Sequence, residues 1–169
     1  MPLPNRRHLR IMKLHKLMTI GGVAIMMNED GTYMQFISNL DVCTDGTGHE
    51  HGDDYHQDQT AYYNGGKFLN ADRDQYIVIP PQIRSKVDPV VMGCQARATN
   101  LKTTKVFDAV TGEIGPDNKT GEAAYCLAKL LNHTVSANCG DSDKHYLYEL
   151  WPGKPAVVNG KHYKLEPAG

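Results

Sequence analysis

The sequence lacks an excess of either charge, because its formal net charge is −1 at pH 7 and its isoelectric point is about 6.7. A chain with no global basic surface gives no indication of nucleic-acid binding. The apolar run LMTIGGVAIMM has 11 residues and is too short to cross a bilayer. Repeats of about 20–50 residues are also absent. The 169 residues are therefore most simply one domain, with at most a short appendage.

Cysteine pairs of the kind that bind zinc are absent. The four cysteines form no CxxC pair and no zinc-ribbon pattern. The sequence allows two alternatives, two disulfides or free buried thiols, for its four cysteines: Cys43, Cys94, Cys126 and Cys139.

The N-terminal segment lacks a clear signal peptide. Lys13, His15 and Lys16 interrupt the approach to the apolar run, and no A-x-A cleavage site follows it. We expect residues 1–13 to form a flexible basic arm and residues 14–169 to form a single catalytic domain. The apolar run is then a buried strand.

Short apolar segments separated by turn residues predict a mainly β protein. The expected strands cover residues 16–27, 32–40, 75–81, 89–99 and 103–115. In the first of them, Gly21-Gly22 marks a bulge or a close backbone approach. Two or three short strands follow over 145–165, with turns at PGKP and NG. One main helix is predicted over residues 120–132, with Thr120 as its N-cap. Many short strands with one helix suit a small barrel better than a doubly wound sheet.

Two glutamates lie nine positions apart around a short turn. Glu113 ends a predicted strand and Glu122 falls in the first turn of the predicted helix, so both carboxyls lie near one edge of the sheet. Hydrolysis of a glycosidic bond needs two such groups on rigid mounts. The plain alternative is that both are ordinary surface glutamates. A helix N-terminus also lowers a carboxyl pKa, whereas a general acid needs a raised one.

Five blocks, in order, resemble the glycoside hydrolase family 75 chitosanases and related phage and bacterial proteins. EIGPDNKTGEAA is similar to the family's D-I-G-P followed by G-E-[AG]-S, and the other blocks are LDVCTDG, DDYHQDQTAY, LNADRDQYIVIPP and YLYELWPG. The resemblance covers roughly residues 39 to 153. It implies a compact six-stranded double-psi-like β-barrel, an inverting mechanism and no cofactor. It also implies that Glu122 is the general acid and Glu113 the general base.

The chain departs from the family pattern at two positions. Glu113 replaces an aspartate and adds one methylene of reach, and Cys43 replaces the middle acid of the D-I-D-x-D-G stretch. Inverting enzymes accept a carboxyl separation of about 6.5–9.5 Å, so the longer side chain is compatible with activity.

The loop over residues 41–58 contains six acids and no lysine or arginine. Such a block is usually a solvated loop. The functional alternative, which the resemblance favours, is a cleft wall that attracts a cationic sugar polymer. The predicted substrate-binding residues are Asp41, Asp45, Tyr55, Tyr62 and Lys119. Histidines 49, 51 and 56 lie in the same loop, but H-x-H alone is a weak zinc signal, and we expect no metal.

The sequence does not identify which polymer is the substrate. Chitosan and bacterial peptidoglycan both fit an endo-acting hydrolase of β-1,4 amino-sugar bonds. The alternatives are a phage lysozyme or muramidase, a lytic transglycosylase, and a non-catalytic carbohydrate-binding virion module. We expect a monomer that acts on an extracellular or cell-wall polymer, with neither nucleic acid nor membrane as a partner. Phage encoding or export by another route would account for the missing signal.

Overall fold

In the computed structural model, residues 12–87 and 91–166 are described, and most of the expected N-terminal arm, residues 1–11, lies outside them. The chain is 49% strand and 9% helix, which confirms the mainly β prediction. The elements in chain order are β1 (Leu14–Ile20), β2 (Val23–Asn28), β3 (Met34–Cys43), β4 (Tyr63–Asn64), β5 (Lys67–Phe68), β6 (Tyr76–Ile79), α1 (Pro81–Val87), β7 (Cys94–Asn100), β8 (Lys105–Ile114), β9 (Glu122–Ala124), α2 (Tyr125–Leu131), β10 (Asp141–Pro155), β11 (Val157–Val158) and β12 (Lys161–His162).

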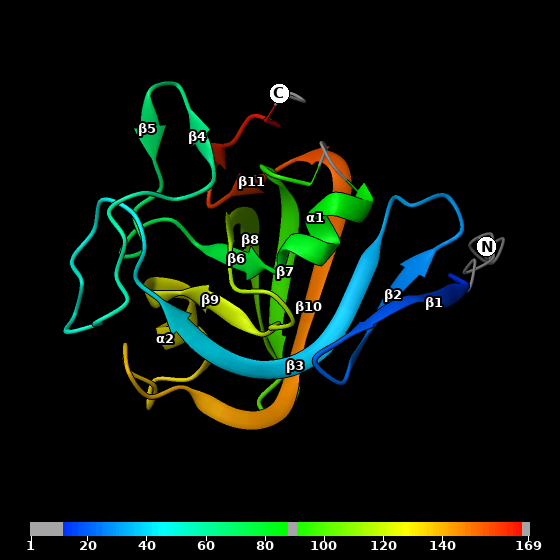
Figure 1. The fold of residues 1–169 in the computed structure, drawn as a ribbon, viewed down its shortest axis with the longest axis horizontal. Coiled ribbons are helices and arrows are strands. Elements are labelled where there is room, and N and C mark those ends of the chain that lie inside the picture. The colour runs from blue at the N-terminus through cyan, green and yellow to red at the C-terminus, as the bar shows by residue number, and fades with distance from the viewer. Residues whose placement is uncertain (1–11, 88–90, 167–169) are drawn as a thin grey trace, which may run out of the picture.

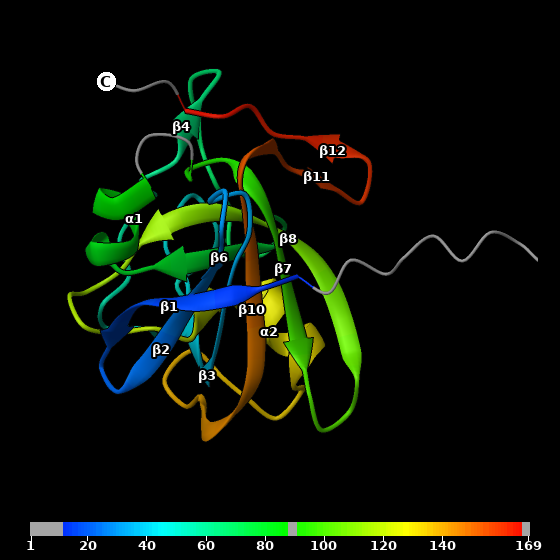
Figure 2. The ribbon, with the colours of Figure 1, turned by 90° about the vertical axis from the view of Figure 1, so that its right-hand side faces the viewer.

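Six of these strands close into a barrel (Figures 1 and 2). The order β3-β10-β7-β8-β6-β9 returns to β3 through a β3–β9 pairing. Two neighbouring pairs, β6 with β8 and β3 with β9, are parallel, and the other barrel pairs are antiparallel. The predicted six-stranded barrel is therefore confirmed. The β1–β2 hairpin continues the sheet outward from β3.

The barrel interior is filled by aromatic and small side chains together. Phe36 of β3 stacks on Tyr148 of β10 with ring centroids 5.2 Å apart. Both rings are buried, as are the alanines of β7 and β9. Alternating large and small residues let the inner faces of a narrow barrel fit together.

The N-terminal apolar run forms a hairpin rather than one bulged strand. Gly21 and Gly22 have φ values of 52° and 79° and make the two-residue turn between β1 and β2. Two successive positive φ angles are typical of the tight hairpin turns that glycine favours. Of the two alternatives expected here, the bulge was wrong, but the close backbone approach is present: a Cβ on Gly21 would lie 2.4 Å from the Asn118 carbonyl oxygen.

The main helix begins later than its sequence pattern predicts. Residues 122–124 form β9, and the helix starts at Tyr125 without a side-chain cap, so Thr120 is not its N-cap. The reason is non-local: β9 pairs with β3 on one side and with β6 on the other, and so closes the barrel. This two-sided pairing outweighs the helix propensity of Glu-Ala-Ala.

Two further features of the chain were not foreseen. The short helix α1 begins at Pro81, where proline's fixed φ and missing N–H suit the first turn of a helix. The PGKP segment is not a turn but a bulge inside β10, where the pairing register shifts between Trp151 and Pro155. The Asn159-Gly160 turn between β11 and β12 is as predicted.

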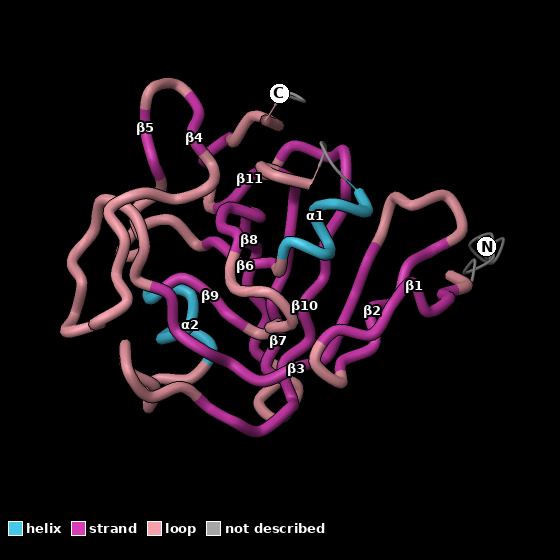
Figure 3. Tube along the Cα trace, in the orientation of Figure 1, coloured by secondary structure: helices cyan, strands magenta, loops and turns pink. Residues whose placement is uncertain are grey.

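The polar loop expected over residues 41–58 begins later, because β3 runs to Cys43, and the rest of it is irregular (Figure 3). The β4–β5 hairpin follows it before β6. Neither helix in the described part of the chain is long and apolar enough to span a membrane. The four cysteines are free thiols, which leaves the disulfide alternative without support.

Candidate active site

A cleft of about 730 Å³ opens where β3, β6, β8 and β9 meet. Its lining includes five carboxylic acids and one lysine: Asp41, Asp45, Asp53, Glu113, Glu122 and Lys119. The chain segment 137–140 forms a further wall.

The strand register places the two glutamates on either side of one residue. Val78 of β6 pairs with Glu113 of β8 and with Glu122 of β9. Neighbouring strands lie about 4.8 Å apart, so the two glutamate backbones are separated by about 10 Å. The sequence therefore placed both carboxyls correctly near one edge of the sheet, although it assigned Glu122 to the wrong element.

Glu113 is buried, and its carboxylate is held by the backbone. Its Oε1 accepts hydrogen bonds from the N–H groups of Ala61 at 2.8 Å and Ile114 at 2.9 Å. Burial, together with the neighbouring Asp45, raises the pKa of Glu113 to about 8 even though the two amides favour the ionised form. Two carboxyls this close share a proton more readily than they both ionise.

Glu122 is half-buried and also has a raised pKa. Burial raises the pKa of Glu122 to about 7; Lys119 opposes this, while Asp41 and Asp45 reinforce it. Because Glu122 lies on β9 and not in a helix turn, the objection from the helix N-terminus does not apply. Gly115 leaves room for this carboxylate, since a Cβ there would lie 3.3 Å from Glu122 Oε2.

Asp41 and Lys119 form an ion pair beside Glu122. Lys119 Nζ lies 3.2 Å from Asp41 Oδ2, and Asp41 pairs with Glu122 across β3 and β9. Burial disfavours the charged lysine, but Asp41 outweighs it and raises the pKa of Lys119. Both predicted binding residues therefore lie in the cleft, next to the candidate acid.

Cys43 occupies the centre of the acidic group. Its thiol, Asp45 and Glu113 each offer a ligand atom within 4.8 Å of the others. Tyr76 donates hydrogen bonds to Cys43 Sγ at 3.5 Å and to the Asp45 carbonyl oxygen at 2.7 Å. Burial raises the pKa of the Cys43 thiol, so it stays protonated among the acids. A neutral group thus stands where the resemblance would place a third charge.

The two predicted tyrosines have different positions. The side chain of Tyr55 is 88% exposed at the rim of the cleft, as a stacking residue requires. Tyr62 is buried, donates a hydrogen bond to the Lys164 carbonyl oxygen at 3.0 Å and lines a different pocket. The expectation that Tyr62 contacts a polymer in the cleft is not supported, because its ring belongs to the core.

The histidines of the acidic loop contact one another and nearby polar side chains. His51 contacts Asp72 through Nε2 and stacks on Tyr125, and His49 packs edge-on against His51. His56 lies against the Thr44 hydroxyl at 2.9 Å. These contacts give the histidines a role in fixing the acidic loop.

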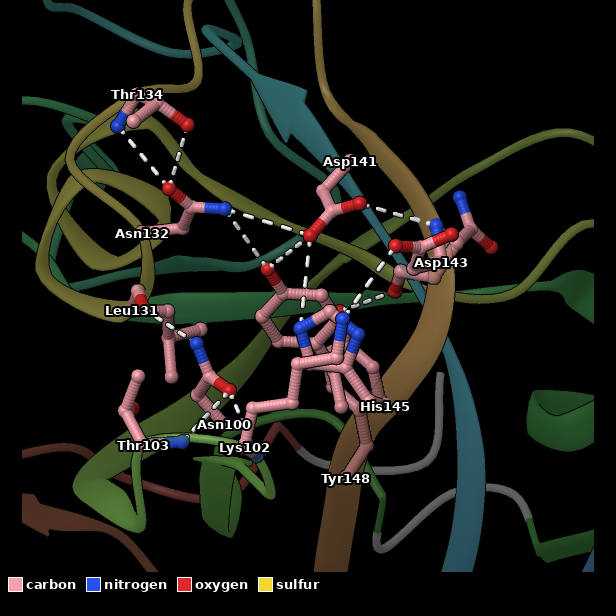
Figure 4. Close-up of polar contacts among 12 residues, drawn as sticks. Asn100, Lys102, Thr103, Leu131, Asn132, Thr134, Asp141, Asp143, His145 and Tyr148 are labelled. Atoms are coloured by element: carbon pink, nitrogen blue, oxygen red, sulfur yellow. Dashed lines mark hydrogen bonds and ion pairs between the residues drawn. The ribbon is translucent and has the colours of Figure 1, made fainter.

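The wall at residues 137–140 was missed by sequence reasoning. A polar network around Asp141 holds it in place. Asp141 Oδ2 accepts a hydrogen bond from Asn132 at 3.4 Å (Figure 4) and another from Tyr146 at 2.7 Å. A Cβ on Gly140 would lie 2.2 Å from the Leu40 carbonyl oxygen, so only glycine permits this close approach to β3. No local motif marks such a wall, because its position depends on contacts across the barrel.

Replacing Glu113 by glutamine is expected to stabilise the fold at high pH. The folded-state pKa is about 8 and the ordinary value is 4.5, so folding takes up a proton between these pH values. The stability of the wild type therefore falls as pH rises through this window. Glutamine keeps the acceptor for both amides but carries no charge, so the variant gains on the order of 2 kcal/mol above pH 8 and nothing below pH 4.5.

Thermal unfolding at both ends of this pH window measures the effect. Glu50→Gln is the matched control, because Glu50 is exposed and should leave the pH dependence unchanged. An equal gain for Glu113→Gln at both pH values would contradict the raised pKa.

The comparison with known families agrees with this geometry. A family model described as fungal chitosanase of glycosyl hydrolase group 75 matches residues 28–167. This range contains every residue that lines the cleft. A search of curated proteins found no match.

Proposed function

Because the chain belongs to glycosyl hydrolase group 75 and is a chitosanase-like glycoside hydrolase, we propose that it cleaves internal β-1,4 bonds of chitosan by inversion. The observation that carries the choice of polymer is the charge of the cleft, where five acids face one lysine. The cleft stays negative even with Glu122 protonated and one proton shared by Glu113 and Asp45. Such a cleft concentrates a polymer of ammonium sugars and repels an anionic one.

Glu122 acts as the general acid. Its pKa of about 7 keeps a proton available in neutral and mildly acidic solution. A carboxylic acid of raised pKa, positioned at the scissile oxygen, protonates the leaving group as the bond breaks.

The Glu113–Asp45 pair acts as the general base. With one proton shared, the pair still carries one negative charge and can accept a proton from a water molecule, as paired carboxyls do in aspartic proteases. The two backbone amides on Oε1 hold Glu113 in place beside Asp45. The raised pKa of Glu113 is thus compatible with the base role.

The separation across β6 supports inversion. Inverting enzymes hold their carboxyls about 6.5–9.5 Å apart to admit a water, whereas retaining enzymes need about 5–5.5 Å. The spacing of two strands between Glu113 and Glu122 corresponds to the larger distance.

The remaining cleft residues bind the polymer. Tyr55 offers a flat ring at the rim for the face of a sugar, and Asp41 offers a carboxylate to an ammonium group. One chain supplies the whole cleft, so we expect a monomer, acting on a polymer outside the cell without nucleic acid or membrane partners.

The activity is expected to fall as pH rises through about 7, because Glu122 then loses its proton. In Lys119→Met the alkaline limb of kcat/KM should move to higher pH. Lys119 lowers the pKa of Glu122, and its removal also leaves Asp41 unpaired beside that carboxyl. The pH profiles of both proteins on one chitosan preparation measure the shift, since titration of the polymer is common to both. An alkaline limb that stays at the same pH, or moves to lower pH, would contradict the role of Glu122 as the general acid.

Product analysis on two polymers tests the proposed substrate. Purified protein is expected to release reducing ends from chitosan and to leave the turbidity of a peptidoglycan suspension unchanged. Loss of peptidoglycan turbidity would instead favour a muramidase, and anhydro-sugar products seen by mass spectrometry would favour a lytic transglycosylase. No cleavage of either polymer would leave a binding module and contradict the proposal.

A further inference from the structure

A second pocket, of about 410 Å³, is lined by the β4–β5 hairpin, by residues 69–74 and by the C-terminal segment. The hairpin and the C-terminal segment lie near each other in the fold (Figure 1). None of the residues that line it lines the acidic cleft. We call it the basic pocket, and its lining consists of Thr47, Tyr62, Asn64, Gly65, Lys67, Phe68, Leu69, Asn70, Arg73, Asp74, Lys161, His162, Tyr163 and Lys164.

The single acid of this pocket is fully engaged within the protein. Asp74 Oδ1 accepts hydrogen bonds from Lys161 Nζ and Tyr163 Oη, both at 2.6 Å, and Oδ2 accepts one from the Asn70 amide at 2.8 Å. Lys161 therefore balances the charge of Asp74. Because Asp74 is already paired with Lys161, it does not neutralise the other cations of the pocket.

Three cations remain for a ligand. Lys67, Arg73 and Lys164 are exposed, and within residues 12–87 and 91–166 none of them forms an ion pair. The nearby Glu166 lies outside the lining, and its carboxylate accepts a hydrogen bond from the Tyr63 N–H. The pocket is thus positive, opposite in sign to the acidic cleft.

The pocket is also preformed and partly aromatic. Phe68 is half-buried and packs on Tyr63 with ring centroids 4.6 Å apart. The buried Tyr62 hydroxyl donates a hydrogen bond to the Lys164 carbonyl oxygen and accepts one from the Lys164 N–H, which ties the C-terminal segment to the residue just before β4. A rigid floor reduces the entropy lost when a ligand binds.

We propose that the basic pocket binds an acidic sugar unit, a pyranose carrying a carboxylate, within an anionic polysaccharide. The cations pair with the carboxylate, with Arg73 able to do so through two hydrogen bonds. The Phe68 ring packs against the sugar face, and the side chains of Asn64 and Thr47 can bond hydroxyls. An inorganic polyanion would use the charges but not the ring. The inference does not rest on the proposed function, because it concerns binding at a separate site.

Titration calorimetry with trigalacturonate tests the proposal, with cellotriose as the neutral probe and inorganic triphosphate as the sugar-free anion. Wild type is expected to bind trigalacturonate and not cellotriose. Lys67→Gln/Arg73→Gln should weaken that binding by about tenfold or more. Lys144→Gln/Lys154→Gln removes the same charge from β10, outside both pockets, and should leave it unchanged. Cleavage of chitosan should be equal in all three proteins.

The aromatic part of the pocket is tested by Phe68→Ala. This variant should bind trigalacturonate about fivefold more weakly than wild type and should bind triphosphate with unchanged affinity. The proposal is overturned if wild type does not bind trigalacturonate, if the control variant loses binding equally, or if Phe68→Ala has no effect. The last result would indicate a surface that attracts any polyanion.

Discussion

Replacing Glu122 by glutamine is expected to lower kcat on chitosan by about 10²–10⁴-fold, with KM little changed. Glutamine has nearly the same shape but cannot donate the proton that the leaving oxygen needs. The change also removes a half-buried carboxyl whose pKa is already raised, so the fold should not weaken. Release of reducing ends at saturating chitosan, below pH 7, measures the loss.

Asp53→Asn is the matched control for this experiment. Asp53 lines the same cleft and its replacement also converts a carboxyl into an amide, but it transfers no proton in the proposed mechanism. We expect it to alter KM and to leave kcat within about threefold. Full activity in Glu122→Gln, or an equal loss of kcat in Asp53→Asn, would remove Glu122 from the acid role.

Replacing Glu113 by glutamine is expected to lower kcat by a similar factor, about 10²–10⁴-fold, because the Glu113–Asp45 pair then lacks the group that accepts the proton of water. The amide side chain can still accept the N–H groups of Ala61 and Ile114, so the site keeps its shape. The loss of activity would accompany the gain of stability at high pH described above. A variant that is more stable but inactive separates the chemical role of Glu113 from a structural one.

Glu113→Asp tests the departure from the family sequence. Aspartate is the residue that the family resemblance places at this position, and it restores the shorter reach. We expect Glu113→Asp to keep activity within about tenfold of wild type, in contrast to the glutamine variant. If Glu113→Gln stays active, the base is another group, and Asp45→Asn should then abolish activity.

The sequence predicted the barrel and the neighbourhood of the two glutamates well, because short strands and the blocks around EIGP are local signals. It placed Asp41, Asp45, Tyr55 and Lys119 as binding candidates, and all four line the cleft. Their roles in binding stay predictions.

The remaining features depended on contacts between distant parts of the chain. Glu122 lies on a strand because β9 is paired on both sides, and no local pattern reports such pairing. Tyr62 lies in a polar stretch yet its ring is buried beside Tyr163, 101 positions later (163 − 62). Residues 137–140 reach the cleft through contacts with distant residues: Asp141 is held by Asn132 and Tyr146, and Asn138 donates a hydrogen bond to the Gly52 carbonyl oxygen.

The position of Asp41 provides a sharp alternative to the inverting mechanism. It pairs directly with Glu122, one strand away, at a spacing of about 5 Å that suits a retaining pair. Its ion pair with Lys119 occupies that carboxylate in the free protein. The stereochemistry of the first product distinguishes the two arrangements.

Proton NMR of freshly cleaved chitosan oligomers, recorded before mutarotation, therefore tests the central claim most directly. Inversion by Glu122 and the Glu113–Asp45 pair predicts that the new reducing ends form first as the α-anomer. A β-anomer at the earliest time point would contradict that mechanism and assign the nucleophile to the Asp41 side of Glu122, and a complete absence of new reducing ends would contradict hydrolysis itself.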